Sequence, residues 1–310
     1  MKVSVVIVNW NVKELLRQCL ASVQAEATEL PPDAVEILVV DNASSDGSQA
    51  MLREEFPDVR LLANAENRGF SAACNQAIAQ SSGEAILLLN PDAALMPGAL
   101  TSLIDHLEHH AQVAAVGPRL LNPDGSIQSS RRRFPSLTTA FLESTIIQSY
   151  FPHLSHLRRY YCQDITEDRE QEVDWLTGAC LLLRRRSWEE VGPFDQRFFL
   201  YFEELDWCLR AKKAGWRIAY LPHAEAVHHG GQSSAQDLLS LQIHFTASKC
   251  GFYRKHFGLL AGQLVRWSLM LNYLLLIAED ALKLALGHKV AMRRQRIAML
   301  GAVLKWGLTA

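Results

Sequence analysis

The stretch EAILLLNPDA, residues 84–93, joins an apolar run to a turn that carries one carboxylate. Residues 85–89 have the length and composition of a buried strand, and the Asn90-Pro91 dipeptide ends it because proline has no backbone N–H to donate. Asp92 follows directly. Asparagine, proline and aspartate are common in turns, so a plain turn explains the motif by itself. A ligand role for Asp92 needs support from the rest of the chain.

The first 120 residues alternate short apolar runs with amphipathic segments. Strands that alternate with helices predict a parallel sheet covered on both faces, which places the chain in the α/β class. The expected strands cover residues 3–8, 36–40, 59–63 and 84–89, and the expected helices begin after residue 11 and cover about 44–55 and 70–80. A later apolar run, residues 175–183, predicts one more buried strand.

Polar residues follow each of the four expected strands. Ligands of open α/β sheets bind at the carboxyl ends of the strands, so these residues favour a binding site there, although polar loops are common in this class. The four strand ends are Asn9-Trp10-Asn11, Asp41-Asn42, Asn64 to Arg68, and Asn90-Pro91-Asp92.

The composition indicates a folded protein of a reducing compartment. A chain of 310 residues with 49% hydrophobic content can form one large domain or two smaller ones. The six cysteines include no C-x-x-C pair and stand mostly in apolar patterns, which favours buried thiols over a disulfide or zinc framework. The short apolar run at the N-terminus lacks a signal cleavage site, so we expect a cytoplasmic protein.

The C-terminal end is basic and helical in pattern. The segment 259–278 is about long enough to span a bilayer, but it carries Gln263, Arg266 and Asn272. We therefore expect a helix that lies in or against an anionic membrane surface. The alternative is a helical hairpin packed on the protein itself or on a second copy in a homodimer.

The densest polar and aromatic segment is FDQRFFLYFEELDWCLRAKKAGW, residues 194–216. On a helix that begins near Glu203, the side chains of Glu203, Asp206 and Arg210 share one face, and Glu204 points elsewhere. The aromatic residues before Glu203 would shield the carboxylates from water and raise a pKa toward that of a general base. A solvated acidic helix start explains the same residues equally well.

A pair of histidines ends a short expected strand in AEAVHHGGQSS, residues 224–234. The two glycines that follow let the chain turn close to a ligand. A single histidine more often has a structural role than a ligand role. We therefore interpret His228 as a metal ligand only if Asp92 lies close enough to bind the same ion.

Seven motifs in this order and spacing resemble family 2 glycosyltransferases, and most closely the bacterial rhamnosyltransferase branch. The resemblance covers roughly residues 1–250 and is far more specific than any single motif. The motifs are VSVVIVNWN, VVDNASSDGS, NRGFSAACNQAI, LLLNPDA, WLTGACLLLRR, FDQRFFLYFEELDWCLRAKKAGW and HHGGQSS.

The resemblance implies a glycosyltransferase A-type fold, a Rossmann-like mixed sheet with helices on both faces, followed by C-terminal helices. It implies a nucleotide-sugar-binding half (1–120), an acceptor-binding and catalytic half of the same domain (121–250), and a helical region (251–310) that associates with membrane or dimerises. It further implies a nucleotide diphosphate sugar, Mg²⁺ or Mn²⁺, and inverting transfer by a single displacement.

The resemblance assigns the donor side to the strand ends. Asp41 would bind the pyrimidine base with help from the loop of Asn9 and Asn11. The metal motif of the family falls on Asn90-Pro91-Asp92, where Asn90 replaces the first carboxylate. Asp92 is then the acidic ligand and His228 the expected second ligand. Arg68, Gly69, Asn75 and Asn90 would line the nucleotide side of the pocket.

The resemblance assigns the catalytic base to Glu204, at a position where the family usually has aspartate. Glu203 and Asp206 would orient the acceptor, or the helix through Arg210, which we also place on the acceptor side. The acceptor motif of the family falls on Thr177, Gly178 and Ala179, although small residues in a buried strand can simply permit close packing.

The resemblance implies transfer of L-rhamnose from dTDP-rhamnose. Together with the basic helical C-terminal end, it implies a saccharide or polyprenyl-diphosphate-linked acceptor in cell-surface polysaccharide synthesis, on the cytoplasmic face of the inner membrane. Because Asn90 and Glu204 depart from the family pattern, the alternative is a catalytically silent relative that binds a nucleotide sugar or acts as a scaffold. No G-x-G-x-x-G follows the first strand, which argues against a dinucleotide-dependent dehydrogenase. Basic residues concentrated in an apolar tail favour a membrane over nucleic acid.

Overall fold

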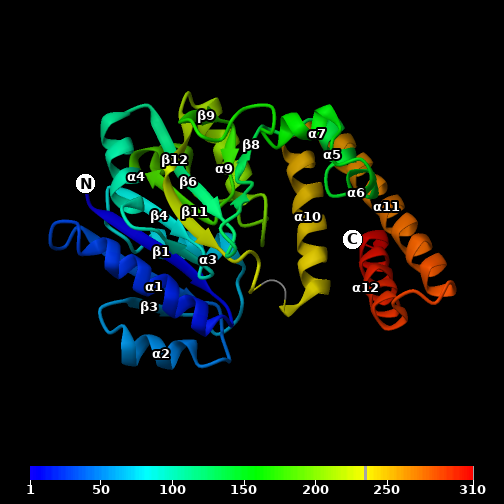
Figure 1. The fold of residues 1–310 in the computed structure, drawn as a ribbon, viewed down its shortest axis with the longest axis horizontal. Coiled ribbons are helices and arrows are strands. Elements are labelled where there is room, and N and C mark those ends of the chain that lie inside the picture. Colours follow the sequence, from blue (N-terminus) through cyan, green and yellow to red (C-terminus); the bar gives the residue numbers. More distant parts are fainter. Residues whose placement is uncertain (234–235, 310) are drawn as a thin grey trace. The chain divides into compact units, whose positions relative to one another are not determined.

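The apolar runs of the sequence form a mixed sheet of ten strands, and two further short strands pair separately (Figure 1). The computed structural model describes residues 1–233 and 236–309. The strands are β1 (Val3–Asn9), β2 (Val35–Asp41), β3 (Arg60–Ala63), β4 (Ala85–Leu89), β5 (Ala93–Leu95), β6 (Val113–Leu121), β7 (Ile127–Gln128), β8 (Arg131–Arg132), β9 (Gln171–Val173), β10 (Trp175–Leu176), β11 (Cys180–Arg184) and β12 (Arg217–His228).

The sheet order is β3-β2-β1-β4-β11-β6-β12-β5, with β7 beside β6 and β9 beside β12. The strands β3, β2, β1 and β4 are parallel, as the alternating sequence predicted, and their carboxyl ends meet at one edge. β11 runs antiparallel to both β4 and β6, so β6 has the same direction as β4. The predicted α/β class with a mixed sheet is confirmed.

Helices cover both faces of this sheet. Val5 and Ile7 of β1 belong to one buried cluster with Leu16, Leu52 and Leu103, which come from three helices on one face. Side chains alternate along a strand, so Val6, only 1% exposed, points to the other face. The helices of this part of the chain are α1 (Lys13–Ala27), α2 (Ser48–Glu55), α3 (Phe70–Ile78), α4 (Ala99–His109), α8 (Arg185–Val191) and α9 (Glu203–Lys213).

The prediction of one continuous strand over residues 175–183 is wrong. β10 pairs with β8 in a separate two-stranded sheet, whereas β11 pairs with β4 and β6 in the large sheet. Residues 177–179 connect the two sheets and belong to neither. The change of pairing partner leaves these three residues outside both ladders, where they face α9.

The described residues divide into two units. The first holds residues 1–134, 165–199 and 203–233, and the second holds the remaining described residues. The second unit is helical, and its long helices α10, α11 and α12 contact one another. Its helices are α5 (Leu137–Leu142), α6 (Ile146–Tyr150), α7 (Ser155–Tyr160), α10 (Leu238–Phe257), α11 (Leu259–Ala285) and α12 (Val290–Thr309).

The polar residues of α11 turn toward the other helices of the second unit. Arg266 Nε donates to the carbonyl oxygen of Gly307 at 2.8 Å, and Asn272 Oδ1 accepts from the backbone N–H of Ile146 at 2.8 Å. Asp280, 1% exposed, pairs with Arg293 and with Arg296 at 3.2 Å. By length and composition alone, α11 could cross a bilayer.

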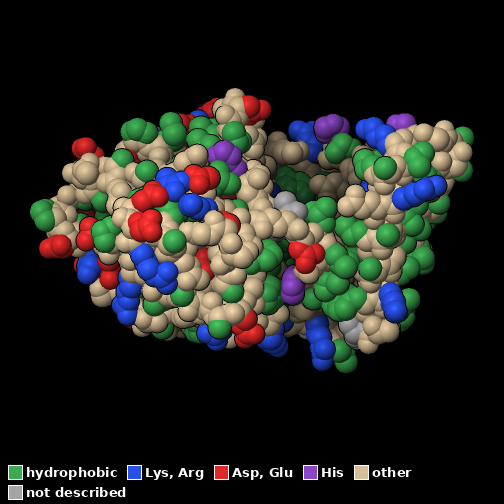
Figure 2. Space-filling view, turned by 90° about the horizontal axis from the view of Figure 1, so that it is seen from below, with side chains coloured by type: hydrophobic (Ala, Val, Ile, Leu, Met, Phe, Trp, Pro, Cys, Tyr) green, Lys and Arg blue, Asp and Glu red, His purple; other side chains and the backbone are tan. Residues whose placement is uncertain are grey.

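The opposite face of α11 is apolar and exposed, and hydrophobic side chains gather over α11 and α12 (Figure 2). Its exposed residues are spaced three or four apart, or at multiples of that spacing, and therefore lie on one side of the helix. We call them the α11 leucine face: Leu260, Leu264, Trp267, Leu271, Leu274, Leu282 and Leu286.

The six cysteines are free thiols, five of them buried and Cys250 half-buried. This confirms the expectation of buried thiols over a disulfide framework.

Candidate active site

Parallel pairing of β1 and β2 places Asn9 directly opposite Asp41 at the carboxyl edge of the sheet. Both side chains are fully buried, and Asn9 Nδ2 donates to Asp41 Oδ2 at 2.9 Å and to Ser44 Oγ at 3.1 Å. Asn9 Oδ1 is buried without a partner among the described residues. An unpaired buried carbonyl oxygen costs about 1–3 kcal/mol, and a ligand N–H would remove that cost.

Asp41 is held from both sides. Its Oδ1 accepts from the backbone N–H of Ser44 at 3.0 Å and from Gln49 Nε2 at 2.7 Å. Its Oδ2 accepts from Asn9, which leaves one lone pair on that oxygen. Asn11 has a positive φ of 53°, and its Oδ1 accepts from the N–H of Ser45 at 2.7 Å. The two loops after β1 and β2 are therefore tied into one polar wall.

The segment Asn67 to Phe70 turns sharply into α3. Gly69 has a φ of +80°, and a Cβ at this position would lie 2.6 Å from the carbonyl oxygen of Phe199. Only glycine fits this close approach. The N–H of Phe70 donates to the same carbonyl oxygen at 2.7 Å. Arg68, directly before the turn, is exposed.

Asn75 lies one turn further along α3 and fixes the chain before α9. Its Nδ2 donates to the carbonyl oxygen of Phe194 at 2.9 Å, and its Oδ1 accepts from the N–H of Phe194 at 3.1 Å. Ser71 Oγ donates to the carbonyl oxygen of Phe198. Asn75 thus supports the pocket indirectly, by holding the loop at Phe194. Both the nitrogen and the oxygen of its side-chain amide are engaged in these hydrogen bonds.

The turn Asn90-Pro91-Asp92 stands between β4 and β5. The N–H of Asn90 donates to the carbonyl oxygen of Ala179 at 2.9 Å, and the N–H of Ala93 closes the turn onto the carbonyl oxygen of Asn90 at 3.0 Å. β5 pairs with β12 in a register that sets Ala93 opposite His228. This register brings together two parts of the chain that are far apart in the sequence.

His228 and Asp92 converge at this turn. The Nε2 atom of His228 lies 3.3 Å from Asp92 Oδ1 and 3.3 Å from Asn90 Nδ2. Asp92 is only 5% exposed, and its Oδ2 accepts from the N–H of Gln232 at 3.2 Å. The predicted neighbours Asn90, Asp92 and His228 therefore lie together.

Gln128 determines which nitrogen of His228 carries hydrogen. Its Nε2 donates to Asn122 Oδ1 at 2.9 Å and to the carbonyl oxygen of His228 at 3.2 Å, so its Oε1 faces His228 Nδ1 at 2.6 Å. His228 then donates from Nδ1, and the lone pair of its neutral ring is on Nε2, beside Asp92. Sequence reasoning missed Gln128, because a glutamine in a two-residue strand gives no signal of this role.

The environment of Asp92 favours its charged form. Burial acts to raise the pKa of the carboxyl group. A proton on His228 Nε2, in whose place a metal ion would stand, acts together with the N–H of Gln232 to hold the pKa below its ordinary value. An ionised oxygen and an imidazole nitrogen about 3 Å apart are suitable neighbouring ligands for one divalent ion. The residues present therefore fit a metal.

Glu204 lies at the start of α9 beside the connecting residues 177–179. The N–H of Gly178 points at Glu204 Oε1 at 3.4 Å, and Glu204 Oε2 is buried with no partner among the described residues. Burial raises the pKa of Glu204, while nearby N–H groups and the charge of Arg132 act in the opposite direction. A carboxylate with a raised pKa and one open oxygen has the properties of a general base.

Glu203 is more deeply buried than Glu204, at 4% exposed. Burial, followed by the charge of Glu204, raises its pKa well above the ordinary value, and its Oε2 has no partner among the described residues. Thr177 Oγ1 is also buried without a partner in this part of the structure. Three of the predicted residues thus present unsatisfied oxygen atoms in the region of Gly178 and α9.

Asp206 and Arg210 share one helix face, as their spacing predicted. Arg210 Nε donates to Asp206 Oδ2 at 2.8 Å, and its other nitrogens donate to the carbonyl oxygens of Val191, Gly192 and Pro193. Asp206 is fully buried. This placement favours a structural role, in which Arg210 anchors α9 to the turn after α8.

Comparison with known proteins gives matches over most of the chain. The model of glycosyl transferase family 2 matches residues 4–192. A protein of Mycobacterium tuberculosis named N-acetylglucosaminyl-diphospho-decaprenol L-rhamnosyltransferase is 35% identical in an alignment of length 277 that covers 86% of this chain and 88% of that protein. Rhamnosyltransferase WbbL of Escherichia coli is 30% identical over 145 residues, which are 46% of this chain and 52% of that protein.

Solved structures share the fold at low sequence identity. The mannosyltransferase PcManGT of Pyrobaculum calidifontis, in complex with GDP-Man and Mn²⁺, aligns with a TM-score of 0.55 and 18% identity over 98% of this chain and 85% of its own. GalNAc-T7, with UDP, GalNAc and Mn²⁺, aligns with a TM-score of 0.55 and 14% identity over 74% of this chain and 44% of its own. The sheet and its helices have the glycosyltransferase A-type fold.

Proposed function

Because this chain belongs to glycosyl transferase family 2, we propose that it transfers a sugar from a nucleotide diphosphate donor to an acceptor hydroxyl in one inverting displacement. Glycosyltransferase activity follows from the family, and the roles of individual residues are our assignment. One observation supports the assignment of these residues to a single active site. Residues Gly178 and Ala179 contact Glu204 on one side and Asn90 on the other, so the candidate base and the candidate metal ligands flank the same short segment.

We assign the divalent ion, Mg²⁺ or Mn²⁺, to Asp92 and His228, with Asn90 beside them. When bound, the ion would neutralise charge that develops on the departing diphosphate. Gln128 keeps the lone pair of His228 on the side of Asp92, and the low pKa of Asp92 keeps its carboxylate charged at neutral pH. This support explains how one aspartate and one histidine can replace the usual pair of acidic residues.

Glu204 acts as the base in this proposal. Its open oxygen, Oε2, accepts the proton of the acceptor hydroxyl as the acceptor oxygen forms its bond to the anomeric carbon. The bond from that carbon to the diphosphate oxygen breaks at the same time, and the diphosphate leaves with the electron pair. Attack from the face opposite the leaving group inverts the anomeric carbon. General base catalysis of this kind contributes roughly 10²–10⁴ in rate.

The donor base binds at the wall of Asn9, Asn11 and Asp41 in our assignment. Asn9 Oδ1 and one lone pair of Asp41 Oδ2 are the acceptors that a pyrimidine N–H would use. Arg68 is exposed at the next loop and can approach the phosphates, and Gly69 lets the backbone come close to the chain before α9.

The acceptor side is assigned to residues 177–179, with Thr177 Oγ1 as an open hydrogen-bonding atom. The mycobacterial relative is named for transfer of L-rhamnose to N-acetylglucosaminyl-diphospho-decaprenol. On that basis we propose dTDP-rhamnose as the donor and a polyprenyl-diphosphate-linked saccharide as the acceptor. Residues 1–120 then form the donor half, 121–250 the acceptor and catalytic half, and 251–310 the helical region.

We propose that the α11 leucine face rests on the cytoplasmic surface of the membrane that holds the lipid-linked acceptor. Leu260 is 74% exposed and Leu286 is 76% exposed, which is costly in water and favourable in a bilayer interface. Exposed basic side chains on the same helical unit suit anionic lipid head groups. They are Arg254, Lys289, Arg294 and Lys305.

The test compares wild type with Glu204→Gln and Asp92→Asn, using dTDP-rhamnose, a lipid-linked N-acetylglucosamine diphosphate, and Mg²⁺ or Mn²⁺. We expect Glu204→Gln to lose roughly 10²–10⁴ in turnover with unchanged donor affinity, and Asp92→Asn to lose the metal-dependent part of donor binding. Equal turnover by wild type and Glu204→Gln would reject the assigned base. Donor binding without turnover in the wild type would instead favour a catalytically silent scaffold.

A further inference from the structure

A second group of possible metal ligands lies at the opposite edge of the sheet. His106 and His110 stand at the end of α4, directly before β6, and Glu170 precedes β9. Since β6 has the direction of β4, its first residue lies at the edge away from Asp92 and Glu204. One ligand atom from each of the three residues falls within 4.8 Å of the other two.

The rings of the two histidines lie against each other, and shared coordination requires one ring to turn so that the two lone pairs converge. Their rings stack with centroids 4.1 Å apart and planes 23° from parallel, as four-residue spacing at a helix end allows. His106 Nδ1 lies 3.5 Å from Glu170 Oε1. His106 lies on α4 and His110 directly follows its last residue. Two histidines four residues apart, joined by a carboxylate, are a ligand set that zinc accepts.

A hydrogen bond orients the ring of His110, and the ring of His106 has an open nitrogen. His110 Nδ1 donates to the carbonyl oxygen of His106 at 2.9 Å, which leaves the lone pair of the neutral ring on Nε2. His106 is only 6% exposed, and its Nε2 is buried without a hydrogen-bond partner among the described residues. A buried imidazole with an unsatisfied nitrogen is costly, and coordination at this ring would add a compensating interaction.

The nearby charges are mixed. His223 and Arg217 are close enough to His106 to act on it electrostatically. Arg217 Nε donates to Glu172 at 2.7 Å, so the positive charge of this arginine is offset by a carboxylate. Two imidazoles and one carboxylate suit zinc and similar transition metals better than Mg²⁺, which prefers oxygen ligands.

We propose that His106, His110 and Glu170 bind a Zn²⁺-type ion, and that the ion fixes the segment 165–171 to the end of α4. This inference is independent of the catalytic assignment. The ligand set leaves room for water at the remaining coordination positions, as expected for a site with three protein ligands.

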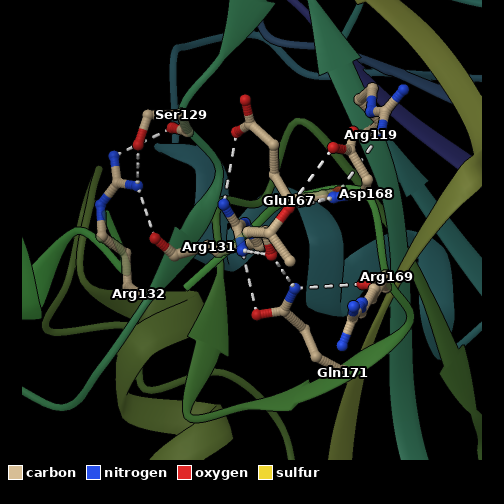
Figure 3. Close-up of polar contacts among 9 residues, drawn as sticks. Arg119, Ser129, Arg131, Arg132, Glu167, Asp168, Arg169 and Gln171 are labelled. Atoms are coloured by element: carbon tan, nitrogen blue, oxygen red, sulfur yellow. Dashed lines mark hydrogen bonds and ion pairs between the residues drawn. The ribbon is translucent and has the colours of Figure 1, made fainter. Parts of the chain in front are cut away.

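The segment 165–171 is already held on its other side (Figure 3). Arg131 donates to the carbonyl oxygen of Thr166 at 3.1 Å and to Gln171 Oε1 at 2.9 Å, and it pairs with Glu167 at 3.3 Å. Arg119 pairs with Asp168 at 3.0 Å. Glu170 is exposed and points to His106. An ion at Glu170 would hold the segment 165–171 on one side, while Arg131 and Arg119 hold it on the other.

Arg131 connects this segment to the acceptor side. It is opposite Leu176 in the pairing of β8 and β10, directly before Thr177. Metal binding at Glu170 would therefore stabilise the segment that supports one side of residues 177–179, although it lies at the other edge of the sheet.

The test uses the full-length protein in an Asp92→Asn background, which removes the only carboxylate from the ligand set proposed for catalysis. ZnCl₂ is titrated calorimetrically into this protein and into versions that also carry His110→Gln, Glu170→Gln or His109→Gln. His109 is the matched control, because it is exposed on the same helix and its Nδ1 is bonded to the carbonyl oxygen of Asp105 at 2.7 Å. We expect one zinc site, weakened at least about tenfold by His110→Gln and Glu170→Gln and unchanged by His109→Gln.

Trypsin provides a second readout that does not depend on calorimetry. Arg169 is exposed and stands directly before Glu170. Zinc should slow cleavage after Arg169 in the Asp92→Asn protein and leave the rate unchanged in Asp92→Asn/Glu170→Gln. Absence of zinc binding in the Asp92→Asn protein would overturn the proposal. Equal affinity in the His110→Gln and Glu170→Gln versions would overturn it as well.

Discussion

His228 and Gln128 hold each other through two hydrogen bonds. Nδ1 of His228 donates to Gln128 Oε1 at 2.6 Å, and Gln128 Nε2 donates to the carbonyl oxygen of His228 at 3.2 Å. The ring is thereby fixed in rotation and tautomer. A residue that orients a metal ligand, as Gln128 would orient His228, raises the affinity of the site for the ion although it does not contact the ion itself.

Gln128→Ala should weaken Mn²⁺ binding in the presence of dTDP by about 10–100-fold, because His228 loses the partner that orients it. Asn122→Ala removes only one of the contacts that position Gln128 and should cause a smaller loss. Titration calorimetry measures both. An unchanged Mn²⁺ affinity in Gln128→Ala would show that His228 is not a ligand or needs no support.

Gly178→Ala should impair use of the acceptor without unfolding the protein. The added Cβ would lie 3.8 Å from the Glu204 side chain, an ordinary contact, but it would occupy space beside the proposed base. We expect a higher acceptor KM, unchanged donor affinity, and a free energy of unfolding within about 0.5 kcal/mol of wild type. Gly301→Ala, a helix position with nothing within 4 Å of the added Cβ, is the control. Unchanged acceptor kinetics would place the acceptor elsewhere.

Glu203→Gln should stabilise the protein at neutral pH. The pKa of Glu203 is raised in the folded state, first by burial and then by the charge of Glu204. Above the unfolded pKa of about 4.3, the unfolded chain releases a proton that the folded chain retains, so stability falls as pH rises. Glutamine removes this dependence. We expect Tm to rise at pH 7.5 relative to wild type.

The Tm difference for Glu203→Gln should shrink toward pH 4, where Glu203 is mostly protonated in both the folded and the unfolded wild type. Unfolding curves between pH 4 and pH 8 measure this. Glu29→Gln changes an exposed glutamate and should show no such pattern. A Glu203→Gln variant that is less stable than wild type at every pH would contradict the buried, proton-retaining carboxyl group.

The double substitution Leu264→Glu and Leu271→Glu should weaken binding to vesicles that contain anionic lipid. The two side chains are 50% and 58% exposed on the α11 leucine face, and each would lose about 1.5–3 kcal/mol of apolar burial, equivalent to at least about tenfold in affinity. Ile127→Glu, an exposed apolar residue of β7, is the control. Flotation measures binding. Retained flotation with loss of a dimer in sedimentation would instead identify the face as a subunit interface.

The strands and their polar ends followed from the sequence because alternation of apolar runs and amphipathic helices depends on local pattern. β1 and β4 occur within a residue of their expected bounds. The expected approach of Asp92 and His228 is present as well, through the register of β5 and β12. Their role as metal ligands stays a prediction.

Other features depend on contacts between distant segments and carry no local signal. Residues 175–183 read as one apolar run, but pairing with β8 on one side and β4 on the other divides it. Arg210 has a charge suited to an acceptor, yet its nitrogens bind carbonyl oxygens of residues 191–193. The apolar segment 259–278 predicted the start of α11, but the helix continues to Ala285. The direction of its polar face depends on contacts with Gly307, Ile146 and Arg293, which the local pattern does not show.

The contacts between α3 and the chain before α9 limit how this enzyme can be recombined with its relatives. Gly69 has no space for a side chain against Phe199, and Asn75 binds both polar groups of the Phe194 backbone. A chimera that takes residues 64–75 from another family member must therefore take residues 194–199 from the same member. An exchange of the loop that we assign to the donor then means transplanting two segments as a matched pair.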